Sequence, residues 1–427
     1  MKITIPSVPH LVHIETTYAC NQNCIFCYNP NRQNKSNFDV LDRVVESVYD
    51  SWIPHVYLIG GEPSLLGVGK LNEYINYLAQ RSSVTIVTNG QIFLEGLSCN
   101  LACIGVPVHG IGETHDYLAN RQGSFKAATS AISGYVNNGF DVRCIPVLTK
   151  TNFNQIYDII KLSKQLGVES VFVDRFEDGG IGSSSSVRLK PSLDQFKTAL
   201  SQMIKGRDDF NIPVGWGTAI PFCLDERIIS ENMSADCGAG ITFCAINPNG
   251  DLRLCNQSER IYGNILSEKI STIWHKPELS EFRNLKWIEK PCLECNVLSE
   301  CLCGCKVDAN YSKTFCVDYA VREGNALCKV QGLPQEQISF SAPAKLRSFS
   351  MNRYTRLNTR HVEKYLVTQY QTIALDETAV IMMRQIISGV ADENLLISIN
   401  SQNVDMEEVR RFVSILEHVN AINVVRG

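Results

Sequence analysis

The sequence lacks the features that place a chain in a membrane, outside the cell or on a nucleic acid. No apolar stretch reaches the roughly 18 residues that a membrane-spanning helix needs. The start of the chain shows no apolar segment behind basic residues, so we expect no secretory signal and a cytoplasmic protein. The formal net charge of −4 gives no support to a nucleic-acid partner. No internal repeat of fixed period is visible.

Cysteine is abundant, with 17 residues in a chain of 427. A secreted disulfide protein would be short and rich in loops, whereas this length suits two or three domains. Without a secretory signal the thiols are expected to stay reduced. Many reduced cysteines in an enzyme-sized chain indicate metal binding or catalysis.

The first half of the chain alternates short apolar runs with longer amphipathic ones. Helices are predicted over Asp39–Ser51 and Phe153–Leu166, each with apolar residues on one face. Six β-α repeats predict a parallel sheet with helices outside, either closed toward a barrel or open and doubly wound. In both cases the site lies at the carboxyl ends of the strands. The predicted strands are Leu11–Thr16, Val56–Gly60, Val84–Asn89, Ala102–Val108, Val142–Leu148 and Ser170–Arg175.

Three thiols follow the first predicted strand on one loop, in the order Cys20-x3-Cys24-x2-Cys27. Thiolates are the usual ligands of iron–sulfur clusters. A four-iron cluster held by three thiolates keeps one iron without a protein ligand, and that iron can bind a small molecule. A zinc site is the alternative, although zinc usually takes four ligands in paired spacings.

With Phe26 before the last cysteine, the triplet resembles the signature of the radical S-adenosylmethionine (radical SAM) enzymes. The resemblance implies a partial (β/α)6 TIM barrel, S-adenosylmethionine as cofactor and an external electron donor of ferredoxin or flavodoxin type. A second motif ends the second strand and is similar to the Gly-Gly-Glu-Pro turn of that family, which implies binding of the methionine ammonium. It consists of Gly60, Gly61, Glu62 and Pro63.

Smaller features fit the same family. Thr88 and Asn89 end the third strand, where relatives have a cofactor-facing turn. Arg121 lies in a segment similar to one after the fourth strand, and it either pairs with the cofactor carboxylate or caps a surface helix. Relatives often have a serine in the fourth strand where this chain has Pro107, so that hydroxyl contact is in doubt.

From about Phe222 to Cys328 the sequence becomes rich in cysteines and turns and resembles the SPASM domain of peptide-modifying radical enzymes. The resemblance implies two auxiliary four-iron clusters, against a structural zinc ribbon as the alternative. The first cluster would be held by Cys237, Cys244, Cys255 and Cys305. The second would be held by Cys292, Cys295 and Cys301 with Cys328, or else Cys316, as the last ligand.

Some cysteines and one neighbouring residue need separate interpretation. In sulfatase-maturing relatives an aspartate that acts as a base follows the cysteine corresponding to Cys255, whereas this chain has Asn256, which cannot take a proton. Cys223 is a candidate hydrogen-atom donor to a substrate radical, with simple packing as the alternative. Cys99, Cys103 and Cys144 are expected to be buried small side chains, and Cys303 is left without an assignment.

The C-terminal part contains no cysteine and is expected to form a third unit. A hairpin is predicted within Thr359–Ala374, followed by helices near Glu377–Ser388 and Met406–Val419. The segment before the first helix resembles the PqqD-like domains, small winged-helix folds that bind leader peptides at a sheet edge. A generic winged helix is the alternative.

The sequence therefore predicts an α/β partial barrel over residues 1–221, a SPASM domain over 222–333 and a small winged-helix-like α+β domain over 345–427. The function implied by the resemblance is a radical SAM peptide maturase that makes a thioether or carbon–carbon crosslink, or an epimer, in a ribosomally made precursor peptide. The alternatives are a radical enzyme for a small molecule or protein side chain, and a non-catalytic metal-binding scaffold. Neither a nucleic acid nor a membrane is an expected partner.

Overall fold

The computed structural model describes residues 5–425, except residues 30, 178–183, 236, 307–308, 310–317, 319–320, 322–347, 362, 401–403 and 405. Cys316 and Cys328, the two candidates for the last auxiliary ligand, lie outside the described residues.

A large parallel sheet forms the centre of the molecule, and all six predicted strands are confirmed. The strands pair in the order β1-β2-β3-β4-β5-β7. Their bounds are β1 Leu11–Glu15, β2 His55–Ile59, β3 Ser83–Val87, β4 Cys103–Val106, β5 Val142–Cys144 and β7 Ser170–Arg175. The run predicted as one strand over Val142–Leu148 is split, because Pro146 lacks an N–H group and separates β5 from β6 (Val147–Leu148). A short parallel strand that was not predicted, β8 (Val214–Trp216), pairs with β7.

Helices cover the outer face of this sheet. The larger ones are α1 Phe38–Asp50, α2 Val68–Leu78, α4 Ser124–Asn137, α5 Ile156–Gln165 and α7 Leu193–Phe210. Helix α1 begins where the Asn37 side chain accepts from the Asp39 N–H, and α7 begins with a reciprocal capping box between Ser192 and Gln195. The predicted helices over Asp39–Ser51 and Phe153–Leu166 are confirmed as α1 and α5.

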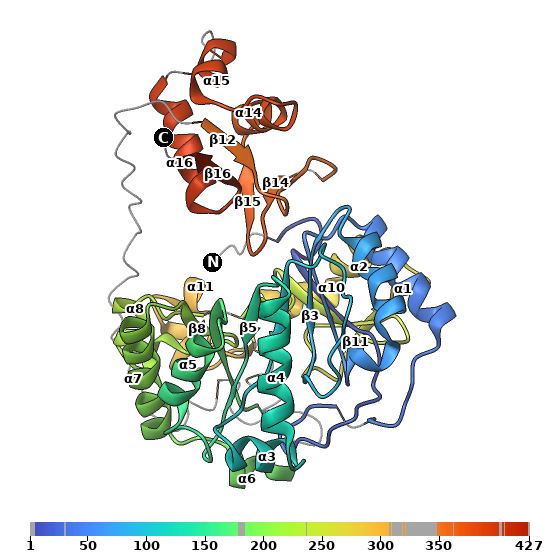
Figure 1. The fold of residues 1–427 in the computed structure, drawn as a ribbon, viewed down its shortest axis with the longest axis vertical. Helices are drawn as coiled ribbons and strands as arrows, with labels where there is room; N and C mark the ends of the chain where they lie inside the picture. The colour runs from blue at the N-terminus through green and yellow to red at the C-terminus, as the bar shows by residue number, and fades with distance from the viewer. Residues whose placement is uncertain are drawn as a thin grey trace.

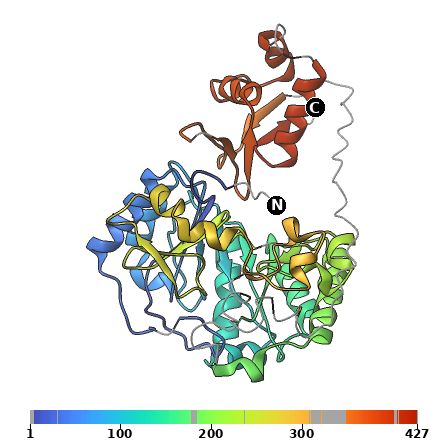
Figure 2. The ribbon, with the colours of Figure 1, turned by 180° about the vertical axis from the view of Figure 1, so that it is seen from behind.

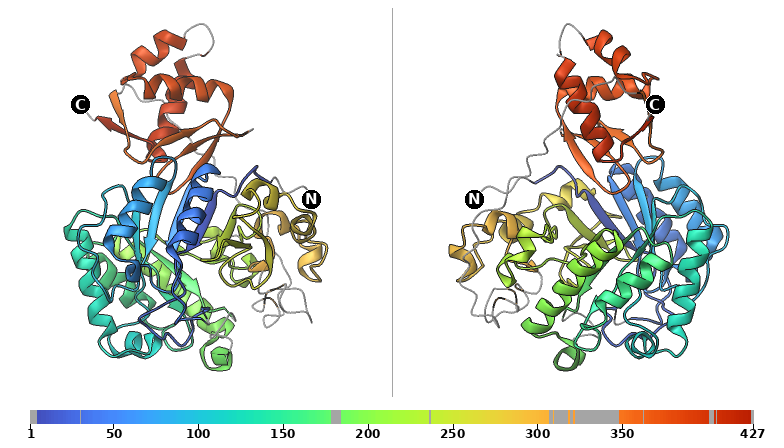
Figure 3. Two further views of the ribbon diagram at one scale, coloured as in Figure 1. Left: turned by 90° about the vertical axis from the view of Figure 1, so that its right-hand side faces the viewer. Right: turned by 60° about the vertical axis from the view of Figure 1, so that its left-hand side comes forward.

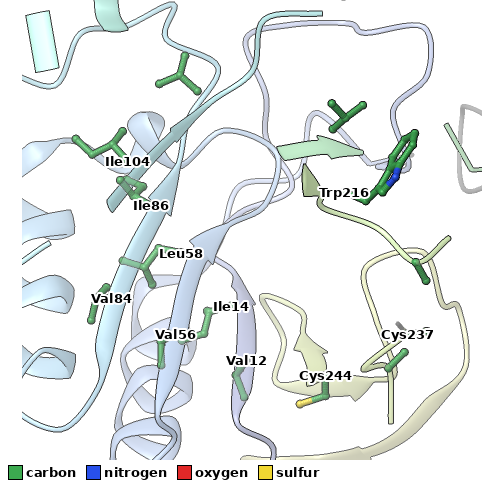
Figure 4. Packing of buried hydrophobic residues seen from close by; sticks show 14 of the residues in the cluster. Val12, Ile14, Val56, Leu58, Val84, Ile86, Ile104, Trp216, Cys237 and Cys244 are labelled. Atoms are coloured by element: carbon green, nitrogen blue, oxygen red, sulfur yellow. The ribbon is translucent and has the colours of Figure 1, made fainter. Parts of the chain in front are cut away.

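Alternation along the strands separates an outer apolar face from an inner polar one. Val12 and Ile14 of β1 point with neighbours such as Val56 into the core beneath the helices (Figure 4). His13 and Glu15 therefore point to the opposite face, which we call the inner face. The inner face curves, because Arg143 Nη1 on β5 lies 3.3 Å from the Tyr57 hydroxyl on β2 although two strands separate them.

The cysteine-rich region continues the same sheet. Its strand β9 (Phe243–Ile246) pairs parallel with β1 on the side away from β2, and β10 (Asp251–Arg253) and β11 (Ile261–Asn264) follow antiparallel. Figure 2 shows this region along one side of the barrel-like unit. Short helices complete both units: α3 Glu113–Ala119, α6 Ser186–Leu189, α8 Arg227–Ser230, α9 Ile270–Trp274, α10 Pro277–Arg283 and α11 Leu298–Cys301.

The C-terminal unit combines two small sheets with three helices. Strand β12 (Ser348–Met351) pairs with β16 (Ile422–Val425), and β13 (Arg356–Asn358), β14 (Lys364–Val367) and β15 (Thr372–Leu375) form an antiparallel sheet. The predicted hairpin and both predicted helices are confirmed, the latter as α14 (Glu377–Ile387) and α16 (Met406–His418). A further helix, α15 (Glu393–Asn400), was not predicted.

The C-terminal unit lies against the amino ends of the parallel strands (Figures 1 and 3). The Ser83 hydroxyl at the start of β3 donates to the Gln369 carbonyl at 2.7 Å, and the Gln369 side chain donates to the Ala102 carbonyl at 2.6 Å. The Tyr354 hydroxyl donates to the Leu101 carbonyl at 2.8 Å. Because the predicted site is at the carboxyl ends, this unit sits at the other end of the sheet.

Within the described residues, no helix combines the length and the apolar character that crossing a bilayer requires. The mixed α/β class with a large parallel sheet is confirmed. The six-unit barrel count, the winged-helix assignment and the three domain boundaries stay predictions.

Candidate active site and iron–sulfur sites

The cysteine triplet lies where it was predicted, on the loop that follows β1. The Cys20 N–H donates to the Arg32 carbonyl at 3.1 Å, which closes the loop at its base. The Ile25 N–H donates to the Leu118 carbonyl of α3 at 3.0 Å. Helix α3 lies at the end of the molecule opposite the C-terminal unit (Figure 1). The triplet therefore faces the carboxyl ends of the parallel strands.

The three thiols are close enough to influence one another. Burial, Glu62 and Cys27 raise the pKa of Cys20 to about 11, and burial, Cys27 and Cys20 raise the pKa of Cys24 further. Thiols in such a position become thiolates when bound iron supplies positive charge. Backbone N–H groups point at two of the sulfurs, from Gln22 to Cys20 Sγ and from Asn29 to Cys27 Sγ, each at 3.4 Å.

In the described part of the chain, no three His, Cys, Asp or Glu side chains converge closely enough to hold a single metal ion. A four-iron cluster makes a different demand, because each thiolate binds a different iron. Separated but mutually interacting sulfurs on one loop fit that demand.

Arg32 holds the cysteine loop in place, and the sequence did not predict this role. Its guanidinium donates to the Cys24 carbonyl at 2.7 Å and to the Gln22 carbonyl at 3.4 Å, and it also bonds the Asn23 side chain. A single arginine in an aperiodic loop gives no sequence signal. Its partners become visible once the loop is folded.

The turn after β2 packs directly on the segment that enters the cysteine loop. A Cβ atom on Gly61 would lie 2.2 Å from the Ala19 carbonyl oxygen, and one on Gly60 would lie 2.4 Å from the Thr17 carbonyl oxygen. The Gly61 N–H donates to Thr17 O at 2.6 Å, and the Glu62 N–H donates to Ala19 O at 2.9 Å. The two glycines thus let two strand ends meet at backbone distance.

Glu62 is buried and its carboxylate already accepts three hydrogen bonds. The donors are the Ser64 N–H at 2.9 Å, the Thr88 hydroxyl at 2.6 Å and the Asn89 N–H at 2.8 Å. Burial raises its pKa above the ordinary value. A carboxylate has about four acceptor positions, so one remains for a cofactor ammonium. Glu62 and Thr88 therefore join the turns after β2 and β3, and their direct contact with a cofactor stays a prediction.

Asn89 and Phe26 both lie beside the cysteine loop. The Asn89 amide donates to the Asn21 side chain at 2.7 Å and lies 3.9 Å from Cys20 Sγ. The Phe26 ring packs edge-on against His109 with centroids 4.6 Å apart. His109 follows β4 in the segment that has Pro107 in place of the family serine.

A buried polar chain supports the loop from α4, and sequence reasoning missed it. The Gln22 amide donates to the Ser124 hydroxyl at 2.6 Å, and that hydroxyl lies 3.0 Å from His115 Nε2. His115 in turn accepts from the His109 N–H through Nδ1 at 3.0 Å. Burial lowers the pKa of His115 to about 4, so this histidine is neutral.

Arg121 occupies an exposed position near the loop rather than its interior. Its guanidinium donates to the Asn21 carbonyl at 2.6 Å. This contact anchors the loop from the turn between α3 and α4, while pairing with a cofactor carboxylate stays a prediction.

The first auxiliary set is partly assembled. Cys237 and Cys244 are buried on the β9 side of the core (Figure 4). Cys255 lies close enough to Cys237 for the two thiols to interact, and burial raises the Cys255 pKa well above its usual range. The Cys305 N–H donates to the buried Asp318 carboxylate at 2.8 Å. Asp318 also binds Arg175 of β7, which ties this region to the barrel-like unit.

The second auxiliary set gathers around one apolar cavity. Cys292, Cys295 and Cys301 line it, and their role as cluster ligands stays a prediction. Cys223 and Cys303 line the same cavity. Cys223 therefore lies among the auxiliary cysteines, and its role as hydrogen-atom donor stays a prediction. Cys303, for which the sequence gave no assignment, is buried, and burial and the nearby Cys292 and Cys237 raise its pKa.

Asn256 connects two residues of β1 on the inner face. Its amide donates to Glu15 Oε1 at 2.8 Å, and its Oδ1 lies 2.7 Å from His13 Nδ1. Arg253 pairs with the other Glu15 oxygen. The position after Cys255 is therefore used to fix polar groups and carries no base.

Comparison with known proteins agrees with this geometry. The chain is 24% identical over 276 residues to the antilisterial bacteriocin subtilosin biosynthesis protein AlbA of Bacillus subtilis. The match covers 62% of this chain and 59% of AlbA. It is 25% identical over 314 residues to the mycofactocin maturase MftC of Mycolicibacterium smegmatis, which covers 68% of this chain and 76% of MftC. Its fold matches the structure of Streptococcus suis SuiB bound to the precursor peptide SuiA with a TM-score of 0.61 and 17% sequence identity. The match covers 74% of this chain and 76% of SuiB.

Two sequence families account for the two cysteine-bearing regions. Residues 14–163 match the radical SAM superfamily, and residues 237–296 match the SPASM iron–sulfur cluster-binding domain. These domains imply S-adenosylmethionine and four-iron clusters as cofactors, and the cysteine loop, its glycine turn and the auxiliary cysteines fit them. The chain belongs to the radical SAM superfamily and carries a SPASM iron–sulfur domain.

Proposed function

We propose that this chain is a peptide maturase that modifies a ribosomally made precursor peptide by radical chemistry. The observation that carries the proposal is the presence, in one chain, of the cysteine loop, the auxiliary cysteines and a C-terminal unit with an unpaired strand edge. The similarity to AlbA, a bacteriocin biosynthesis protein, and to MftC, a maturase, supports the same class of reaction.

The cofactor supplies a 5′-deoxyadenosyl radical when S-adenosylmethionine binds the open iron and accepts an electron. The residues of the chain organise the site for that chemistry. Arg32 and Arg121 fix the cysteine loop through its backbone carbonyls. Glu62 keeps the turns after β2 and β3 in register and retains one acceptor position toward the site.

Strand β15 is the proposed docking edge for the leader peptide. In the described part of the C-terminal unit, β15 pairs with β14 on one side and has no strand on the other. The Thr368 N–H donates to the Gln371 carbonyl at 2.9 Å, so these two residues form a hydrogen-bonded pair at the hairpin end. Hydrogen-bonded and non-hydrogen-bonded pairs alternate along an antiparallel hairpin, so the N–H groups of Thr372 and Ala374 point to the open edge. An extended peptide can add there as a further strand.

The two ends of the proposed reaction path lie far apart along the sheet. The C-terminal unit contacts the amino ends of the strands through residues such as Gln369 and Tyr354, whereas the cysteine loop follows the carboxyl end of β1. A precursor that binds β15 therefore needs a connecting segment that runs along the molecule before its modified residues. We propose that the segment after the leader has this length.

Replacing Ala374 with proline tests the docking edge. Ala374 is exposed, and proline at an edge position removes an outward N–H without removing a β14–β15 hydrogen bond. We expect Ala374→Pro to weaken binding of the precursor encoded beside the gene, measured by fluorescence anisotropy. Ala374→Val keeps the N–H and serves as the matched control. Equal affinity in both variants would remove β15 as the docking edge.

Point variants are a cleaner test than deletion of residues 345–427. Removing the whole unit would expose the strand ends that Gln369 and Tyr354 cover, and lost activity would then have two explanations.

Mass spectrometry of the precursor after co-expression decides between the main alternatives. A thioether or carbon–carbon crosslink lowers the mass by two hydrogens, whereas epimerisation leaves it unchanged. An unmodified peptide together with S-adenosylmethionine cleavage would favour a small molecule or a protein side chain as substrate. Absence of cleavage in a protein with full iron would favour a non-catalytic scaffold. An external ferredoxin- or flavodoxin-type donor and a cytosolic location are part of the same proposal.

A further inference from the structure

One carboxylate on the inner face has no assigned task. Asp174 lies near the carboxyl end of β7, and its neighbours Val171 and Val173 are fully buried beneath α5 and α7. Alternation therefore turns Phe172 and Asp174 to the inner face. Arg143, which reaches Tyr57 across that face, stacks over the Phe172 ring at 4.4 Å and confirms the orientation.

The adjacent strand is shaped to accommodate this carboxylate. The β7–β8 register pairs Phe172 with Gly215, and Gly217 follows beside Asp174. A Cβ atom on Gly217 would lie 2.2 Å from Asp174 Oδ1, so any larger residue there would displace the carboxylate. Gly217 leaves Asp174 half-buried and has no side chain that could donate a hydrogen bond to its carboxylate.

Among the described residues, the carboxylate of Asp174 differs from those of Glu15, Glu62 and Glu177 in having no partner. Glu15 is bound by Arg253 and Asn256, and Glu62 accepts three hydrogen bonds. Glu177 accepts from Arg175 Nε at 3.3 Å. In the described part of the chain, Asp174 has no hydrogen bond or ion pair at its side chain.

Asp174 lies near the edge of the sheet that also carries the cysteine loop, because β7 and β1 belong to one parallel sheet and both groups lie at carboxyl ends of strands. Burial and Glu177 raise the pKa of Asp174 to about 7, and Arg143 opposes them. A carboxyl group with a pKa near the working pH is suited to proton transfer.

We propose that Asp174 accepts the proton released when the precursor peptide closes its new bond, an inference that rests on the proposed function. The hydrogen atom of the substrate carbon goes to the 5′-deoxyadenosyl radical and gives 5′-deoxyadenosine. Closing a carbon–sulfur or carbon–carbon bond at that carbon then releases one proton and one electron. The proton goes to the Asp174 carboxylate and the electron to an oxidised auxiliary four-iron cluster, so the peptide loses two hydrogen atoms in total.

This assignment selects among the products. Epimerisation returns a hydrogen atom to the substrate carbon and needs no proton acceptor. A carboxylate on the inner face that has no partner among the described residues, with Asn256 unable to act as a base, therefore favours a crosslink over an epimer. Asp174 takes the role from a strand of the parallel sheet instead of from the loop after Cys255.

The test compares Asp174→Asn with Asp174→Glu in the holoenzyme, using the adjacent-gene precursor peptide in D2O. We expect Asp174→Asn to form 5′-deoxyadenosine at nearly the wild-type rate while crosslinked peptide falls by about 100-fold. Unclosed substrate radicals should take an electron from the reductant in the assay and a deuteron from solvent, so the recovered peptide should carry deuterium. Asp174→Glu should regain part of the crosslinking, and Glu15→Gln should keep the wild-type ratio of crosslink to 5′-deoxyadenosine.

The outcomes separate the proposal from the function on which it rests. Wild-type crosslinking by Asp174→Asn overturns Asp174 as the acceptor and leaves the peptide maturase intact. Equal loss of 5′-deoxyadenosine and of crosslink in both Asp174 variants indicates a structural role and also overturns it. Absence of any peptide product with the wild-type enzyme overturns the proposed function itself.

Discussion

The contact between the Gly60–Gly61 turn and the cysteine loop makes a sharp prediction for Gly61→Ala. The added Cβ would lie 2.2 Å from Ala19 O and 2.4 Å from Tyr18 O, well inside the ordinary contact distance of about 3.5 Å. The backbone just before Cys20 must therefore move by roughly 1 Å. Overpacking of this kind costs about 1–3 kcal/mol.

The movement also strains two backbone hydrogen bonds. These join Gly61 N to Thr17 O at 2.6 Å and Glu62 N to Ala19 O at 2.9 Å, each contributing about 1 kcal/mol. The combined cost is about 3–5 kcal/mol and falls on the cysteine loop. We expect the first cluster to be lost or S-adenosylmethionine affinity to fall by at least about 100-fold, since every 1.4 kcal/mol is tenfold.

The assay is iron content together with the electron paramagnetic resonance spectrum of the reduced, anaerobically reconstituted protein. The auxiliary clusters should keep their signals while the response to S-adenosylmethionine disappears. Gly69→Ala is the matched control, because nothing lies within 4 Å of its added Cβ and it sits in α2, where alanine is favoured. Wild-type iron and a wild-type response in Gly61→Ala would refute the reasoning.

Further predictions concern the hold of Arg32 on the cysteine loop, the stability of the fold in acid and the cysteine-rich region. Arg32→Met should lower iron retention by the first cluster during dialysis against a chelator, whereas Arg32→Lys should lose less, because a charge remains near the Cys24 carbonyl. Burial lowers the pKa of His55 to about 4, so its contribution to stability is present above about pH 6.5 and is lost as the pH falls toward 4. The loss is up to about 3 kcal/mol, and His55→Gln should reduce the drop in the urea midpoint between pH 7 and pH 5. Arg175→Met should weaken the auxiliary cluster signals more than the first one, because Arg175 binds the Asp318 carboxylate that accepts from Cys305 N. Each prediction would be contradicted if its variant matched the wild type in iron loss to the chelator, in the pH dependence of the urea midpoint or in the auxiliary cluster signals.

The strands and the catalytic loop were predictable because their signals are local. Apolar runs bounded by polar turns marked β1 to β7, and the spacing of three cysteines placed the loop directly after β1. Strand β8 was missed because it has three residues, one of which is Gly215. A Cβ atom on Gly215 would lie 3.2 Å from Phe172 Cε1, a tight contact that no local pattern records.

The partners within the site were not predictable, because they join residues far apart in the chain. Asn256 meets Glu15 and His13 across more than two hundred positions, and Gln369 meets Ala102 across a similar span. The resemblance to the SPASM domain gave the proposed ligands of the second auxiliary set, and they stay a prediction, whereas the cavity that Cys292, Cys295 and Cys301 share with Cys223 and Cys303 depends on how the turns fold. The location of the C-terminal unit at the amino ends of the strands likewise required the structure.

The most direct test of the central claim is 5′-deoxyadenosine formation by the anaerobically reconstituted protein with S-adenosylmethionine and dithionite. Cys20, Cys24 and Cys27 are predicted to hold a cluster with one open iron, so the wild-type protein should form 5′-deoxyadenosine and Cys24→Ala should form none. A protein with full iron content that leaves S-adenosylmethionine intact, or an active Cys24→Ala variant, would contradict the account.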